Sequence, residues 1–138
     1  MTSAGPELGD RAEVRAIVTQ ADTAVAAGSG DVPVLATPRL LALAEAAAVA
    51  AIAPRLAPSQ TSVGTAARVE HRRASPVGAE LMVEAELTEM TGNRLVFMFI
   101  ARPADDSDHV IGAGTIERVV VDRDRFVAQA QARTQAEA

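Results

Sequence analysis

The sequence contains no cysteine, tyrosine or tryptophan, and it has only three phenylalanines in 138 residues. Without cysteine the chain can form no disulfide, and thiol catalysis and thiolate metal sites are excluded. Single-stranded nucleic acids are bound by stacking their bases on aromatic side chains, and such rings are nearly absent here. The net charge of −5 also disfavours binding to a phosphate backbone. We therefore expect no nucleic-acid partner and no catalysis by a thiol.

The sequence also shows neither a signal peptide nor a membrane-spanning stretch. Residues 1–7 lack the basic start and the apolar run of a signal peptide. The longest apolar stretch, residues 40–53, is interrupted by Glu45 and is too short to cross a bilayer. The two histidines stand at a spacing that forms no recognisable metal site. We expect a cytoplasmic protein with no membrane partner, no metal and no other cofactor.

One long, alanine-rich helix is predicted over residues 37–56. Thr37 suits the N-cap, because its hydroxyl can accept a bond from an unpaired backbone N–H, and Pro38 suits the first helical position. Pro54 lacks an N–H and ends or bends the last turn. A helix that is apolar all round is usually buried. Glu45 is its only acidic residue, so this carboxylate must be paired, hydrated, protonated or used in chemistry.

The rest of the chain mostly alternates apolar and polar residues, as β-strands do. Strands are predicted over residues 11–19, 62–74, 80–88, 94–101 and 109–121. The strand 94–101 is apolar on both faces and is therefore expected to be central in a sheet. Gly112 and Gly114 in the last strand indicate a bulge or a close approach to another group. Residues 21–31 are expected to form a mobile loop.

The order of elements predicts a single α+β domain over residues 1–138, with a flexible tail over 1–8 and a short polar helix over 122–134. The economical arrangement is a curved, five-stranded antiparallel sheet wrapped around the one long alanine-rich helix, because small side chains let the sheet come close. An exposed edge strand would favour pairing with a second copy of the chain, so a homodimer is expected. The sequence leaves the choice between dimer and tetramer open.

Several stretches, in this order and at this spacing, resemble one family. They are Thr37 with Glu45 eight residues later, the run Ser62-Val63-Gly64-Thr65-Ala66 followed by His71, and the run from Ile111 to Arg118. Together they resemble the hotdog-fold acyl-CoA thioesterases, in particular the fluoroacetyl-CoA thioesterase family. The resemblance runs from about Gly9 to Arg133. It implies a hotdog fold, an acyl-CoA substrate of small or medium size, and hydrolysis of its thioester.

The resemblance also implies roles for individual residues. Thr37, Glu45 and His71 fall on the catalytic positions of the family, and Gly64 and Arg118 fall on substrate-binding positions. Glu45 would be the base that activates water or a direct nucleophile, and His71 would be its proton partner. Thr37 lies about 12 Å from Glu45 along an ideal helix, so we expect it to orient or donate a hydrogen bond rather than attack. Gly64 would bind the thioester oxygen, and Arg118 the pantetheine arm or the phosphates of CoA.

Each of these residues also has a structural interpretation. Glu45 could be a paired glutamate, His71 a satisfied core histidine, Thr37 an N-cap and Gly64 a turn or strand glycine. The alternative function is therefore a hotdog module that binds acyl-CoA or another acyl ligand without turnover. A third hypothesis is a purely structural dimer, which no CoA ligand would stabilise.

One departure from the family predicts the substrate range. The fluoroacetyl-specific enzyme carries an aromatic gate in a longer segment before the helix, whereas the segment Gly28-Ser29-Gly30-Asp31 is shorter and has no aromatic residue. We expect a more open pocket, broad acyl specificity and no large preference for fluoroacetyl-CoA over acetyl-CoA. Thiol-release kinetics on both thioesters would check this, and a strong preference for the fluorinated substrate would contradict it.

Overall fold

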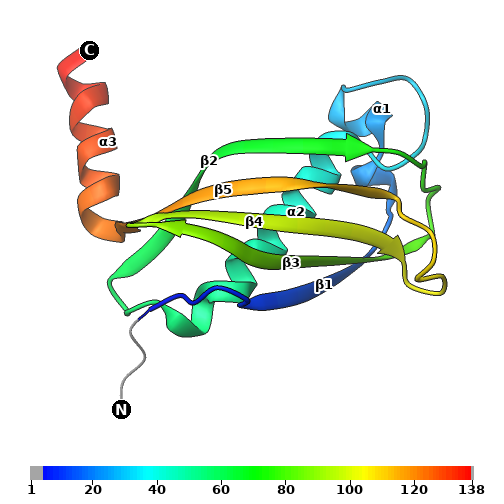
Figure 1. Cartoon of the computed structure of the whole chain (residues 1–138). Helices are drawn as coiled ribbons and strands as arrows, with labels where there is room; N and C mark the ends of the chain where they lie inside the picture. Colours follow the sequence, from blue (N-terminus) through cyan, green and yellow to red (C-terminus); the bar gives the residue numbers. More distant parts are fainter. Residues whose placement is uncertain (1–4, 138) are drawn as a thin grey trace.

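A five-stranded antiparallel sheet curves around one long helix in the computed structural model, which describes residues 5–137 (Figure 1). Along the chain the elements are β1 (Arg11–Ile17), η1 (Gln20–Asp22), α1 (Ala24–Ala27), α2 (Thr37–Ile52), η2 (Ala53–Arg55), β2 (Gln60–His71), β3 (Glu80–Thr91), β4 (Arg94–Pro103), β5 (Gly112–Asp122) and α3 (Arg123–Glu137). The strand order across the sheet is β1-β3-β4-β5-β2. This arrangement confirms the predicted α+β fold, and it places β4 in the centre, as the two apolar faces of that strand predict.

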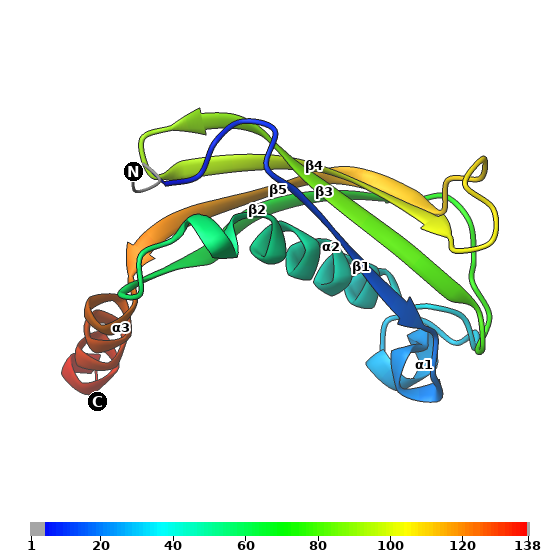
Figure 2. The same ribbon diagram turned by 90° about the horizontal axis from the view of Figure 1, so that it is seen from below.

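The core lies between the concave face of the sheet and α2 (Figure 2). From the helix it takes buried residues of small or medium size: Leu40, Leu43, Ala44, Ala47, Ala48, Ala51 and Ile52. From the sheet it takes alternate residues of the strands, with Phe97 and Phe99 of β4 as the largest completely buried side chains. Alanine at the closest positions of α2 leaves room for these two rings.

The helix is not buried all round, contrary to the sequence-based expectation. Ala42, Ala46, Val49 and Ala50 form an exposed apolar strip along α2. The sheet curves over only one side of the helix, so this strip stays uncovered in the part of the chain that the structure describes (Figure 2).

By length and composition alone, α2 and η2 form a helical span, Thr37–Arg55, that is long and apolar enough to cross a membrane. The sequence analysis considers a shorter run, residues 40–53 interrupted by Glu45, and predicts that it is too short to cross a bilayer. The core helix of a soluble protein passes the same test, and here the span packs against the sheet.

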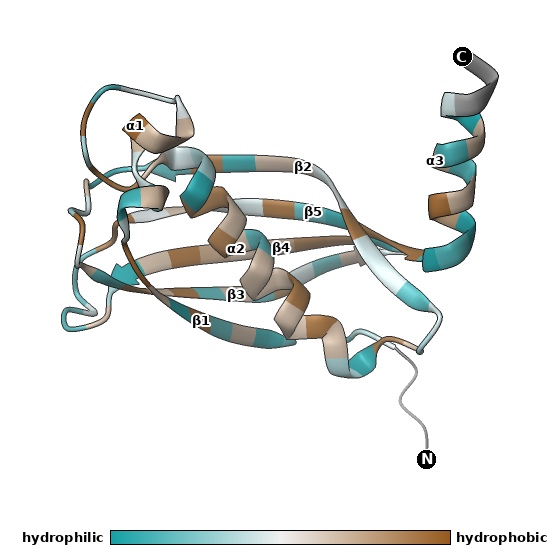
Figure 3. Cartoon of the chain, turned by 180° about the vertical axis from the view of Figure 1, so that it is seen from behind, coloured by the Kyte–Doolittle hydropathy of each residue, from teal (hydrophilic) through white to brown (hydrophobic). Residues whose placement is uncertain are grey.

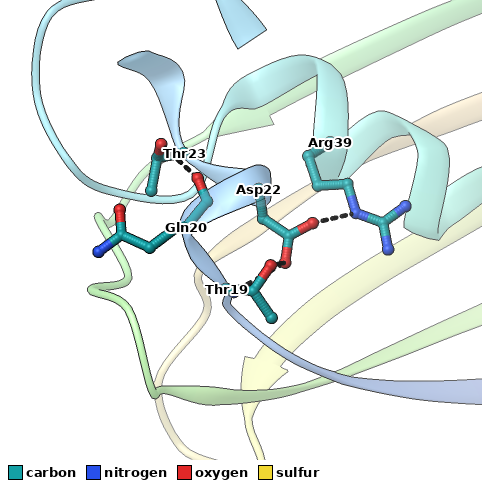
Figure 4. Close-up of polar contacts among 5 residues, drawn as sticks. All are labelled: Thr19, Gln20, Asp22, Thr23 and Arg39. Carbon is teal, nitrogen blue, oxygen red and sulfur yellow. Dashed lines mark hydrogen bonds and ion pairs between the residues drawn. The ribbon is translucent and has the colours of Figure 1, made fainter. Parts of the chain in front are cut away.

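The segment before α2 is more structured than the predicted loop. It contains η1 and α1, and we call residues 20–36 the pre-helix segment. Thr19 and Asp22 cap η1 reciprocally, and the Asp22 carboxylate also accepts a 2.9 Å bond from Nε of Arg39 in the first turn of α2 (Figure 4). The pKa of Asp22 is lowered, chiefly by the backbone hydrogen bond from Thr19, and Arg39 lowers it further. These bonds fix the pre-helix segment against the start of α2.

The two ends of the chain differ from their predicted forms. The flexible tail predicted over residues 1–8 lies partly outside the described residues, and Glu7 already contacts Arg55 of η2 at 3.4 Å. The C-terminal helix is longer than the predicted 122–134, since α3 runs for 15 residues from Arg123 to Glu137. It leaves the sheet at the end of β5 and stands apart from it (Figure 1).

Candidate functional site

Thr37 and His71 meet at one end of the sheet. Thr37 is the first residue of α2, and its Oγ1 lies 2.8 Å from Nδ1 of His71, the last residue of β2. The N-cap is Ala36 rather than the predicted Thr37, and no side chain caps the helix. The Ala36 N–H instead donates to the carbonyl of Asp22. This bond fixes the backbone at Ala36, one residue before the predicted N-cap. The Thr37 hydroxyl is thereby left for the imidazole.

Gly112 allows this contact to form. It pairs with His71 across the β2–β5 ladder, and a Cβ at this position would lie 2.8 Å from Cδ2 of Leu40 and from the carbonyl oxygen of Glu70. A side chain there would push the end of β2 away from the first turn of α2. The close approach that the sequence predicts at Gly112 therefore brings His71 beside Thr37.

The imidazole of His71 is only partly satisfied within the chain. Its Nε2 is buried and has no hydrogen-bond partner among the described residues. Burial lowers the pKa of His71 from its ordinary value, because a charged ring loses hydration there, and the backbone of Arg73 opposes this shift. His71 is therefore neutral at pH 7, with one nitrogen bonded to Thr37 and the other buried without a partner among the described residues.

A second group of polar residues lies further along α2. Arg118 is 8% exposed, and its guanidinium donates from Nη1 to Oε2 of Glu45 at 3.0 Å. The same guanidinium donates from Nε to Oγ of Ser62 and from Nη2 to the Ser62 carbonyl, both at 2.8 Å. Three bonds in different directions fix a planar guanidinium, so Arg118 holds the Glu45 carboxylate in one place.

Gly64 forms the floor under this carboxylate. A Cβ built on Gly64 would lie 2.6 Å from Oε2 of Glu45 and 3.4 Å from Nη1 of Arg118. Only glycine therefore lets the carboxylate rest directly on the backbone of β2. The Glu45 side chain is 38% exposed, so water or a substrate can reach it.

The structure places the predicted site residues in two groups rather than one. Thr37 and His71 form the first group, and Glu45, Gly64 and Arg118 form the second. No hydrogen bond or ion pair joins Glu45 to His71 in the described part of the chain. Eight helical residues, or about 12 Å, separate Thr37 from Glu45. The pairing of Glu45 with His71 that the sequence predicts is thus not made within a single chain.

The structure favours a different role for Arg118 than the predicted binding of CoA. Arg118 is buried, and its guanidinium is already bonded to Glu45 and Ser62. An arginine with these contacts orients a carboxylate rather than holding a CoA phosphate. Sequence reasoning did not select Ser62, because its contact with Arg118 depends on the register between β2 and β5.

A cavity of about 330 Å³ lies beside the first group, lined by Thr37, His71, Arg73 and part of the pre-helix segment.

The fold and these two groups define a hotdog-fold protein of the thioesterase superfamily. A hot-dog-like protein from Thermanaerovibrio acidaminovorans superposes with a TM-score of 0.81 at 21% identity, over 91% of each chain, and shows the same fold. A variant of the thioesterase FlK in complex with acetyl-CoA superposes with a TM-score of 0.85 at 32% identity, over 94% of this chain and 99% of that one.

Two sequence comparisons identify the family. The sequence model of the family described as "Fluoroacetyl-CoA-specific thioesterase" matches residues 18–124. A fluoroacetyl-CoA thioesterase from Streptantibioticus cattleyicolor is 40% identical over 103 residues, which are 75% of this chain and 72% of that protein. The chain belongs to the fluoroacetyl-CoA-specific thioesterase family.

The environment of His71 leads to a direct prediction. In a His109→Gln variant His71 is the one remaining histidine, so its ring protons can be followed by NMR as pH is varied. We expect its midpoint below the ordinary value of about 6.5, because burial disfavours the charged ring. The exposed His109, which pairs with Asp106, lies away from the first group, so its removal should leave the fold intact. A midpoint at or above the ordinary value would contradict the described environment.

Proposed function

We propose that this protein hydrolyses small acyl-CoA thioesters as a cytoplasmic homodimer, with Glu45 as base or nucleophile. The observation that carries the proposal is the Glu45 carboxylate, held by Arg118 over Gly64 and open to solvent on its other side. The acetyl-CoA complex of the FlK variant supports an acyl-CoA thioester as the substrate class. The net reaction adds water to the thioester and releases a carboxylic acid and the CoA thiol.

Glu45 can act in two ways. As a base it takes a proton from a water molecule that attacks the thioester carbon. As a nucleophile it attacks that carbon itself and forms an anhydride, which water then hydrolyses. Both routes need a carboxylate that is fixed in direction, and the hydrogen bond from the buried Arg118 fixes it. An N–H of the backbone at Gly64 is the proposed donor to the oxyanion that develops on the carbonyl.

His71 and Thr37 serve the leaving group. The thiolate of CoA needs a proton as the C–S bond breaks, and an imidazole titrates in the range that suits this transfer. The hydrogen bond between Thr37 Oγ1 and Nδ1 of His71 fixes the orientation of the ring. Thr37 therefore positions His71, in agreement with the role that its distance from Glu45 predicts.

A homodimer is supported by the edge strand β2. Five consecutive residues of β2, from Gly64 to Arg68, are exposed, and the outer edge of the strand has no neighbour in the described chain. The exposed apolar strip of α2 (Ala42, Ala46, Val49 and Ala50) is also uncovered. Antiparallel pairing of two β2 strands would satisfy the strand edge and extend the sheet through both chains. Burial of the apolar strip would add hydrophobic stabilisation.

The same pairing would complete the site. A two-fold axis near the middle of the exposed run, at Ala66 and Ala67, reverses the direction of the partner's β2. The His71 end of one strand then lies beside the Gly64 end of the other. Each site would combine Glu45, Gly64 and Arg118 of one chain with Thr37 and His71 of its partner. This arrangement accounts for the separation of the two groups within a chain.

The alternative is a module that binds acyl-CoA without turnover. In that case the Arg118–Glu45 bond and the Thr37–His71 bond would only stabilise the fold. Replacement of Glu45 by the isosteric glutamine separates the two functions, because glutamine fills the same space over Gly64 without the negative charge.

We expect Glu45→Gln to lower the rate of CoA release by at least about 100-fold, since it removes the base or nucleophile. The matched control is Glu84→Gln on the exposed convex face of β3, which should keep full activity. Acetyl-CoA should still raise the melting temperature of Glu45→Gln. Full hydrolytic activity of Glu45→Gln would overturn the mechanism. Ligand stabilisation of the wild type without any turnover would favour the binding module.

A further inference from the structure

The C-terminal helix α3 has little support within its own chain. It stands apart from the sheet and is largely hydrophilic (Figure 3). Every residue from 123 to 134 is exposed, and its packing is chiefly with β5, from which it starts. Helices of this length are marginal in water unless an apolar face packs against something. The exposed face of α3 therefore needs a matching surface.

Two apolar side chains of α3 need such a surface. Phe126 is 41% exposed and Val127 is 46% exposed. Ala130 lies one turn further along and extends this small apolar face. Three of the exposed polar residues around it are Arg123, Asp124 and Arg125, so the border carries two positive charges and one negative charge.

A matching surface occurs on the pre-helix segment. Val25 is 55% exposed and Val32 is 51% exposed, and Asp31, next to Val32 in the chain, supplies an exposed carboxylate. This segment and α3 lie at opposite ends of the sheet, so they cannot meet within one chain (Figure 1). Both, however, lie on the same side of the sheet as α2 (Figure 2).

The two-fold pairing of β2 would bring these surfaces together. In Figure 1, α3 extends past the β2 edge of the sheet, into the side where a second chain would continue the sheet. The reversal of the partner's β2 places the partner's pre-helix segment at that same end. We propose that α3 of each chain packs on the pre-helix segment of its partner, with Phe126 and Val127 against Val25 and Val32. This inference rests on the homodimer of the proposed function.

The contact would place α3 at the opening of the partner's site. Asp31 and Val32 line the cavity of about 330 Å³ that also contains Thr37 and His71. A helix seated on Val32 therefore forms an outer wall of this cavity. It packs on the outer side of the pre-helix segment, which contains no aromatic residue of its own.

Disulfide cross-linking tests the contact without background, because the chain contains no cysteine. A full-length chain carrying Val127→Cys and Val32→Cys is oxidised and run on a non-reducing gel. We expect a covalent dimer that disappears on reduction, because the two cysteines come close only between chains. The pairs of Phe126→Cys with Val32→Cys and of Val127→Cys with Val25→Cys allow for small differences in the seating of the helix.

The matched control combines Val127→Cys with Met98→Cys, which is 56% exposed on the convex face of the sheet. It should give no covalent dimer. Equal cross-linking in this control would overturn the proposal, because it would reflect random collisions. A chain that is dimeric by light scattering, with none of the three test pairs cross-linking, would overturn the placement of α3 alone. A chain that is monomeric at all concentrations would overturn both α3 docking and the homodimer, whereas turnover in Glu45→Gln tests the catalytic role separately.

Discussion

The bond between the buried guanidinium of Arg118 and the carboxylate of Glu45 is the constraint on which the site depends. A carboxylate in the middle of an alanine-rich core helix is costly unless it is paired. Arg118 reaches it from β5, Ser62 of β2 fixes the guanidinium, and Gly64 leaves space for the carboxylate. Removing the arginine alone would leave a partly buried charge unpaired, which costs more than the bond contributes. The helix, two strands and a glycine thus act together to keep one carboxylate fixed and accessible.

The other group of candidate site residues lies elsewhere in the same chain. His71 and Thr37 are held together at the end of β2, where Gly112 lets strand and helix approach. In the proposed homodimer, one two-fold axis at the edge of β2 would bring each group beside the other group of the partner. The oligomer would then be part of the mechanism, because a single chain holds the two groups apart.

Much of the fold could be predicted from local sequence, whereas the grouping of the site could not. The two apolar faces of β4 predict its central position, and Gly112 predicts a close approach, because both are properties of single strands. The N-cap of α2 is Ala36 rather than the predicted Thr37. Local sequence does not predict this, because the backbone bond from Ala36 to Asp22 depends on the fold of the pre-helix segment. Sequence analysis paired Glu45 with His71 and did not predict that Arg118 of the same chain holds the carboxylate. That contact depends on the register of β2 against β5, which shifts between Gly64 and Ala66, and local patterns do not determine that register.

The central claim is that each site takes Glu45 from one chain and His71 from the other, and mixed dimers test it most directly. Glu45→Gln and His71→Ala chains with different tags are co-expressed, and the dimer carrying both tags is purified. Such a dimer contains one site with both native residues if the site is shared between chains, and none if each chain holds its own site. We predict that each homodimeric variant is nearly inactive and that the mixed dimer recovers about half of the wild-type activity. A mixed dimer as inactive as its parents would contradict the shared site.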